Sequence, residues 1–473
     1  MTAGWETVVG LEVHCELRTG TKLFCSCRNS FGDEPNTNTC PVCLGLPGSL
    51  PVLNQMAVEH AMRIGNALHC EVRPSIFHRK NYFYPDMPKD YQVSQYDEPI
   101  NVDGWLELPD GGRVGIERAH LEEDTGKTTH VGGGGRIHQA EHSLVDYNRA
   151  GVPLVEIVSR PDLRSAEQAR AYVAELRAIL VATGASDGKM EEGSLRVDAN
   201  VSVRPEGAAG YGTRCEIKNM NSLRSLGRAI DHEVTRQIDL LTSGGRVVQE
   251  TRHWDESDGR THAMRSKEEA FDYRYFPEPD LVPLDPDEAW RARVRSSLPV
   301  LPAARRQAVA AAVGLAPAEA ATVVASDLDA LVLAAVAAGA DPRLAFNRVA
   351  NEVAADIDAA PGLDPSAFAR LVTMEATGRL GATQAKAVLA DLLAKGGDPD
   401  AIARAKGFEA MEDDAVARAV DEAIGAHPEE WARLRDGDGK MTGFFVGLVM
   451  KATAKKANGK VVTDLLRARA AGG

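Results

Sequence analysis

One segment near the start of the chain alternates strictly between apolar and polar side chains. In VVGLEVHCEL, residues 8–17, the polar positions are Glu12, His14 and Glu16. Successive side chains of a strand point to opposite faces, so we expect a strand with one apolar face and one polar row spaced roughly 7 Å apart. Such a row can hold a metal ion or meet the phosphates of a nucleotide. For these residues alone, the simpler interpretation is a half-buried edge strand with a wet, acidic face.

Length and composition limit the class of protein. At 473 residues the chain exceeds a single core, and we expect about two to four domains. It is 44% hydrophobic and 26% charged, which is ordinary for a globular protein. The N-terminus lacks a secretory pattern, and the longest apolar stretches fall far short of the ~20 residues of a membrane helix. We therefore expect a soluble, cytoplasmic protein that contacts no membrane.

Charge is distributed unevenly along the chain. The net charge of −14 argues against sequence-blind coating of nucleic acid. From Gly439 to the end, however, seven basic residues face a single acid, Asp464. Lys451, Lys455 and Lys456 within this tail are candidates for contact with a phosphate backbone. The alternative is a solvated helix face.

Four of the seven cysteines form two close pairs. Cys25 and Cys27 make the first pair, and Cys40 and Cys43 the second. In a cytosolic chain, paired cysteines favour metal ligation over disulfides, and four thiolates close a structural Zn²⁺ site without an open position. The alternative is a group of reduced, buried thiols. We expect the remaining cysteines to be packing residues; these are Cys15, Cys70 and Cys215.

Sequence character changes in the second half of the chain. Proline-dense text over Phe276–Trp290 indicates a boundary, and beyond Pro302 the chain is alanine-rich with helical periodicity. Within residues 371–400 we expect two helices, the second stopped by glycines 396 and 397, followed by a third that Asp398 caps. We predict three domains, spanning residues 1–292, 293–404 and 405–473.

Further carboxylates lie in the first of these domains. The segment His120–His130 places Glu122, Glu123 and Asp124 before a Gly-Lys-Thr. This is no phosphate-binding loop, because Leu121 occupies the position of its first glycine. An acidic surface loop is the ordinary interpretation.

Two predicted strands also carry polar groups. Glu156 stands inside the apolar strand GVPLVEIVS, where a carboxylate requires a cation or a hydrogen-bond network. The run SLRVDANVSVR places a polar row opposite an apolar face. This row is either a ligand-reading surface or a solvated sheet face, and the two are equally consistent with the pattern. Its members are Arg196, Asp198, Asn200, Ser202 and Arg204.

Many of these segments resemble one known family, GatB, which is a component of the tRNA-dependent amidotransferases. The resemblance covers Trp5–Leu284 in the family's order and spacing, and a short glycine-rich insertion begins at Gly132. The matching segments are WETVVGLEVHCEL, KNYFYPDMPKDYQVSQYDEPI, HLEEDTGK, LVDYNRAGVPLVEIVS, KMEEGSLRVDANVSVRP, EIKNMNS and DYRYFPEPDLVPL. Farther on, GKMTGFFVGLVMKA resembles the family's YqeY-like tail.

The resemblance implies an α+β fold. Its parts are an N-terminal catalytic "cradle" with a mixed or antiparallel sheet and a zinc knuckle, an all-α domain, and a helical YqeY-like tail. It implies ATP-dependent phosphorylation of the side-chain carboxylate of Glu-tRNA(Gln) or Asp-tRNA(Asn), followed by amidation with ammonia. Matched residue by residue, Glu12, His14, Glu123 and Glu156 correspond to catalytic Mg²⁺ ligands. We expect ATP or substrate contacts from Arg196, Asp198, Asn200, Ser202 and Lys218.

Ammonia has no source in this sequence, because neither an N-terminal cysteine nucleophile nor an amidase motif is present. The resemblance implies that a partner amidase subunit, GatA, supplies it and that a small subunit, GatC, braces the pair. Two other classes remain open. A zinc-stapled tRNA-binding adaptor leaves Glu156 and the polar row unexplained, and a free-standing ATP-dependent ligase leaves the basic tail unexplained.

Overall fold

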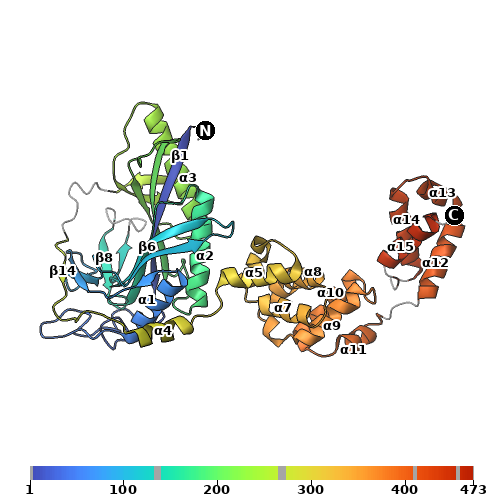
Figure 1. Cartoon of the computed structure of the whole chain (residues 1–473), viewed down its shortest axis with the longest axis horizontal. Helices are drawn as coiled ribbons and strands as arrows, with labels where there is room; N and C mark the ends of the chain where they lie inside the picture. The colour runs from blue at the N-terminus through green and yellow to red at the C-terminus, as the bar shows by residue number, and fades with distance from the viewer. Residues whose placement is uncertain are drawn as a thin grey trace. The chain divides into compact units, whose positions relative to one another are not determined.

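The computed structural model describes residues 4–132, 140–264, 273–408, 413–453, 457 and 459–471. The chain divides into two compact units, Met1–Pro302 and Ala303–Gly473 (Figure 1). Within the described residues, every strand belongs to the first unit and the second is helical. This α+β organisation, with a sheet first and helices after it, is as predicted. The predicted division into three domains stays a prediction.

A twelve-stranded sheet forms the body of the first unit, and β1 (Trp5–Glu16) lies inside it. β1 pairs antiparallel with β10 (Leu195–Pro205) and with β9 (Pro153–Ser159), so it is a central strand and not an edge strand. The path runs β13-β12-β11-β10-β1-β9-β6-β4-β3-β14, with β2 and β5 beside β6. Of the described pairings only β11–β12 is parallel.

The remaining strands are short. They are β2 (Glu71–Val72), β3 (His78–Asn81), β4 (Tyr91–Ser94), β5 (Asn101–Glu107), β6 (Arg113–Glu123), β11 (Cys215–Lys218), β12 (Thr251–Asp255), β13 (Arg260–Ala263) and β14 (Phe276–Pro277), with a separate pair formed by β7 (Lys127–Val131) and β8 (His142–Asp146).

Helices cover the apolar face of the sheet. α1 (Gln55–Ala67), α2 (Ala166–Ala182) and α3 (Leu223–Thr242) share one hydrophobic core with the apolar positions of β1, β6 and β10. Each helix starts at a side-chain cap, namely Asn54, Ser165 or Ser222, which accepts a backbone N–H of the first turn. α4 (Glu288–Ser296) packs against α1 through Val294. The opposite face of β1 therefore remains for polar side chains.

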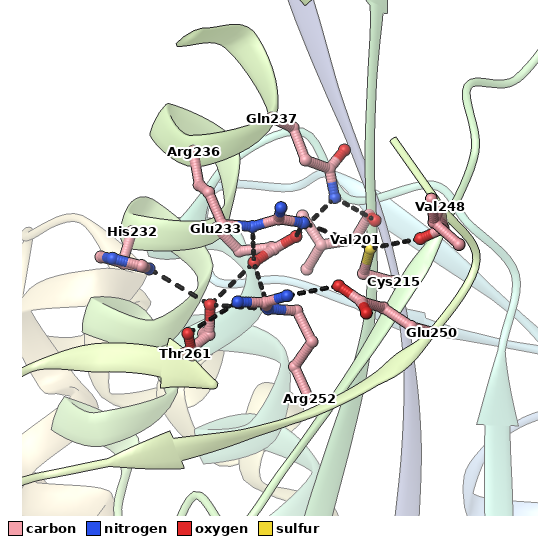
Figure 2. Close-up of polar contacts among 10 residues, drawn as sticks. All are labelled: Val201, Cys215, His232, Glu233, Arg236, Gln237, Val248, Glu250, Arg252 and Thr261. Carbon is pink, nitrogen blue, oxygen red and sulfur yellow. Dashed lines mark hydrogen bonds and ion pairs between the residues drawn. The ribbon is translucent and has the colours of Figure 1, made fainter. Parts of the chain in front are cut away.

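A buried ion network joins α3 to strands β12 and β13 (Figure 2). The fully buried Glu233 accepts from Arg236 at 2.6 and 2.9 Å and from the Thr261 hydroxyl at 2.9 Å. Arg252 Nε lies 3.5 Å from the same carboxylate, and Gln237 links it to the Val201 carbonyl of β10. A buried carboxylate is tolerated only when it is paired in this way. The network thus fixes the side of the sheet that carries β10 and β11.

The second unit contains two separate hydrophobic clusters. The first is built from α5 (Pro302–Val313), η3 (Pro317–Ala320), α6 (Ala321–Ala325), α7 (Asp329–Ala337), α8 (Pro342–Arg348), the turns η4 (Val349–Val353), η5 (Ala354–Asp356) and η6 (Ala360–Gly362), α9 (Pro365–Ala376), α10 (Ala382–Lys395) and α11 (Pro399–Ala405). The predicted helices of residues 371–400 are confirmed. α10 ends at Gly396, whose φ is +67°, and the Asp398 side chain caps α11.

The second cluster is formed by α12 (Asp413–Ala426), α13 (Pro428–Arg435), α14 (Lys440–Ala452) and α15 (Gly459–Ala471). No single helix in the described part of the chain is long and apolar enough to cross a membrane. By length and composition alone, one pair bent by 108°, Pro302–Val313 with Pro317–Ala325, passes the same test together.

Candidate functional site

Strand register gathers four polar side chains into one row across the sheet. His14 on β1 is opposite Arg196 on β10 and opposite Glu156 on β9, and Glu156 is in turn opposite His120 on β6. Directly opposite residues on neighbouring strands point to the same face. Segments far apart in the sequence therefore meet on the face that the helices leave free.

The centre of this row is a cluster of one imidazole and two carboxylates. His14 Nε2 lies 3.6 Å from Glu122 Oε1 and 4.0 Å from Glu156 Oε2. One ligand atom from each of these three residues lies within 4.8 Å of the others. Carboxylate oxygens in a half-buried setting suit Mg²⁺ or Mn²⁺, and the imidazole alone would favour a softer metal. This donor set fits a divalent cation.

Glu156 has the charged partner that a carboxylate in an apolar strand requires. His120 Nε2 is 3.3 Å from its Oε2. Burial works to raise the pKa of Glu156, yet His120 and His14 together hold it well below the usual range. The carboxylate is therefore ionised and available as a ligand.

Glu12 lies beside the cluster, on the same face of β1. Burial raises its pKa, and the negative charge of Glu156 raises it further. Asn200 Nδ2 donates to Glu12 Oε1 at 2.9 Å, which orients the carboxylate. Since two neighbouring carboxylates repel each other, a cation between them is favoured.

The structure does not bring Glu123 to this cluster. As the neighbour of Glu122 on β6, it points to the other face, where Lys89 and the backbone N–H of Val93 donate to it, the latter at 2.9 Å. The physical reason is the two-residue period of a strand. Glu122 occupies the place at His14 and Glu156 that the sequence analysis assigns to Glu123.

The predicted polar row of β10 flanks the cluster. Arg196 donates to Asp124 at 2.6 Å, and Lys218 on β11 donates to Asp198 at 2.6 Å and lies 2.9 Å from Glu216. These ion pairs distinguish the row from a merely solvated sheet face. Ser202 lies farther along the same face and is buried.

Three residues of this face carry too weak a signal in the sequence to be predicted as site residues. They are His120, Glu122 and Lys80. For His120 and Glu122 the alternation along β6, HLE, is the available signal, because it places both on one face. Lys80 on β3 has no comparable signal, since only the pairing of β3 with β4 and of β4 with β6 brings it here.

The four predicted cysteines converge. One Sγ from each of Cys25, Cys27, Cys40 and Cys43 lies within 4.8 Å of the others. Zinc–sulfur bonds of about 2.3 Å in a tetrahedron separate the sulfurs by about 3.8 Å, so this cluster fits a structural Zn²⁺. The second knuckle is a tight turn in which Leu44 N donates to Cys40 O at 3.1 Å and Gly45 has a φ of +68°.

The other cysteines pack. Cys15 is buried in the core of the first unit, and Cys70 contacts that core. Cys215 is buried, and its thiol donates to Val248 O at 3.4 Å (Figure 2).

The basic tail is only partly described. Lys451 is exposed on α14, and Lys455 and Lys456 lie outside the described residues.

Together, the fold and the site define an α+β protein with a cation-binding sheet face and a separate four-cysteine module. Residues 7–292 match the family model described as the GatB/GatE catalytic domain, and residues 330–469 match the GatB domain. The chain therefore belongs to the GatB family.

Curated relatives are similar over nearly the whole chain. A protein of Thermobifida fusca is 50% identical, covering 98% of this chain and 94% of its own length. One of Frankia casuarinae is 51% identical, with coverages of 99% and 96%. One of Carboxydothermus hydrogenoformans is 46% identical, with coverages of 98% and 98%. The names of all three describe the GatB-type component of an aspartyl/glutamyl-tRNA(Asn/Gln) amidotransferase.

Proposed function

We propose that this chain is the component of a tRNA-dependent amidotransferase that activates and amidates the side-chain carboxylate of Glu-tRNA(Gln) or Asp-tRNA(Asn). The observation that carries the proposal is the cluster of His14, Glu122 and Glu156, with Glu12 beside it. The names of relatives that are 50% identical over 98% of the chain support it.

The reaction needs two steps because a carboxylate oxygen is a poor leaving group. In the first step, that oxygen attacks the γ-phosphorus of ATP, the bond from this phosphorus to the β–γ bridging oxygen breaks, and ADP leaves. In the second step, ammonia attacks the acyl carbon, the carbon–oxygen bond to phosphate breaks, and the surplus proton passes to solvent. Both reacting groups of the first step are anions, so the site must neutralise charge.

Glu12, His14, Glu122 and Glu156 are the residues that would hold Mg²⁺, with His14 acting through a water molecule because imidazole is an unusual Mg²⁺ ligand. When bound, the ion neutralises the phosphoryl oxygens and positions them for in-line transfer. We assign ATP and aminoacyl contacts to the flanking residues Arg196, Asp198, Asn200, Ser202 and Lys218. The four cysteines would hold a structural Zn²⁺ apart from this chemistry.

Ammonia comes from a partner, which we identify as the amidase GatA, with GatC as the third component; the assembly acts in the cytoplasm. We place the domain boundaries near residues 292 and 404, and the two hydrophobic clusters of the second unit support the latter. Lys451, Lys455 and Lys456 would contact the tRNA backbone.

ATP hydrolysis by the purified complex, measured with and without mischarged tRNA, tests the proposal. We expect hydrolysis that depends on Glu-tRNA(Gln) or Asp-tRNA(Asn). A non-catalytic adaptor would show none with either, and a free-standing ligase would hydrolyse ATP with a free amino acid and ammonium alone.

A further inference from the structure

Lys80 is the exception among the cations around the polar face of the sheet. Arg196 and Lys218 each donate to a carboxylate, and Arg79, next to Lys80 on β3, donates to Glu278 at 2.7 and 2.8 Å. Lys80 has neither a hydrogen bond nor an ion pair within the described part of the chain. A half-buried ammonium group without an anion in contact is costly, so a charge at this place needs a reason.

The position of Lys80 turns it toward the cluster. Lys80 is opposite Gln92 on β4, and two residues along β4 Ser94 is opposite Glu122 on β6. Lys80 therefore shares a face with Glu122. Burial works to lower its pKa, but Glu122 foremost and Glu156 more weakly raise it above its ordinary value, so the side chain is charged.

Aromatic rings keep this ammonium in place. Lys80 Nζ lies 4.9 Å from the centroid of Tyr273, a cation–π contact that fixes the head group and leaves its N–H donors unused. The Tyr273 segment is itself tied to β3, since Asn81 N donates to Tyr273 O at 3.0 Å. Tyr275 stacks on Tyr96 at 4.0 Å and extends the wall.

We propose that Lys80 is a substrate-binding residue that receives an oxyanion of the reacting pair beside the cluster of His14, Glu122 and Glu156. The proposal rests on the function proposed above, which brings two oxyanions to this face: the γ-phosphoryl group of ATP and the side-chain carboxylate of the aminoacyl group. Lys80 supplies a fixed positive charge that a divalent cation, already ligated by the carboxylates, does not supply from that side.

Binding by the assembled complex distinguishes the two oxyanions. The first arm compares the affinities for ATP and ADP in the presence of Mg²⁺, and the second compares Glu-tRNA(Gln) with Gln-tRNA(Gln), which lacks the charge. In the variant Lys80→Met we expect one of these two preferences to fall by about tenfold or more, the loss typical of a hydrogen bond to a charged group. The arm that falls identifies the oxyanion.

Three controls separate binding from a structural role. Lys80→Arg should retain most of the preference, and Lys127→Met, at an exposed lysine on β7, should retain all of it. Mn²⁺ affinity measured by electron paramagnetic resonance should stay level or rise in Lys80→Met, because a positive charge has left the neighbourhood of the carboxylates. If Lys80→Met does not fold, Lys80→Gln keeps a polar head group and replaces it.

Unchanged preferences in both arms, in a folded variant, would overturn the assignment of Lys80. Weaker Mn²⁺ binding together with a lower melting temperature would also overturn it, since that result marks Lys80 as structural. The proposed function fails separately, if the wild-type complex itself shows no ATP hydrolysis dependent on mischarged tRNA.

Discussion

At the scale of single residues, the exchange of Glu123 for Glu122 follows from the geometry of one strand. Both carboxylates lie in β6 and are nearly completely buried. They differ in face, so Glu122 meets His14, whereas Glu123 meets Lys89. Identical side chains in consecutive positions thus have different chemistry, and only the direction of the side chain decides which is a ligand.

Substituting each glutamate by glutamine tests this distinction. Glu122→Gln removes an ionised ligand, and we expect Mn²⁺ affinity to fall by at least about tenfold, with tRNA-dependent ATP hydrolysis falling in parallel. Glu123→Gln is the matched variant, and its Mn²⁺ affinity should stay within about twofold of wild type. Electron paramagnetic resonance titration measures both. Equal losses in the two variants would contradict the assignment of Glu122.

At the scale of elements, polar clusters hold the pieces around the site. The cysteine knuckles pin two short loops near β1, and the network around Glu233 pins α3 to β12 and β13 (Figure 2). Neither cluster includes a proposed ligand of the divalent cation. We therefore expect their loss to reduce stability before it affects chemistry.

Zinc content tests the cysteine module. Protein purified without chelators should carry about one Zn²⁺ per chain, since four thiolates complete a tetrahedral site. Removal of the ion by a chelator should lower the melting temperature, because the binding free energy of a structural metal contributes to folding. Elemental analysis and thermal unfolding measure these quantities. Fully reactive thiols in metal-free protein of unchanged stability would support the buried-thiol interpretation.

Truncation of Glu233 tests the ion network. Glu233→Ala leaves Arg236 and Arg252 without their buried partner, and we expect a loss of about 3–5 kcal/mol in the free energy of unfolding. Asp239→Ala, at an exposed carboxylate on the same helix, is the control, with an expected change of about 0.5 kcal/mol or less. Chemical denaturation measures both. A small loss for Glu233→Ala would show that the arginines find solvent or other partners.

At the scale of the whole molecule, the two units divide the roles. All proposed ligands of the divalent cation and of Zn²⁺ lie in Met1–Pro302, and the basic tail lies in Ala303–Gly473. The second unit has hydrophobic clusters of its own, so its last helices have a core that is independent of the sheet. Removal of the tail should accordingly leave the site intact.

Deletion of residues beyond 405 tests this separation. We expect weaker tRNA binding with a smaller dependence on salt, because fewer lysines displace counterions from the phosphate backbone. Transamidation should fall mainly through a higher KM for tRNA, while glutamine hydrolysis and Mn²⁺ binding by the assembled complex are retained. Filter binding across a series of salt concentrations is the measurement. Unchanged tRNA affinity at moderate salt would identify the tail as an ordinary solvated face.

Local features were accessible from the sequence because their causes are local. The alternation of β1 and β10, the cap of α11 at Asp398 and the spacing of the four cysteines each depend on residues close together in the chain. Resemblance to known motifs added the family, and the matches over residues 7–292 and 330–469 agree with it.

Tertiary structure alone decided which polar groups meet. The pairing of β1 with β9 and of β9 with β6 brings Glu156 to His14 and His120, and no periodicity within one segment specifies that order of strands. The same holds for Lys80, which arrives through β3 and β4. Strand order is set by the packing of the apolar face as a whole, so the polar face is assembled as its consequence.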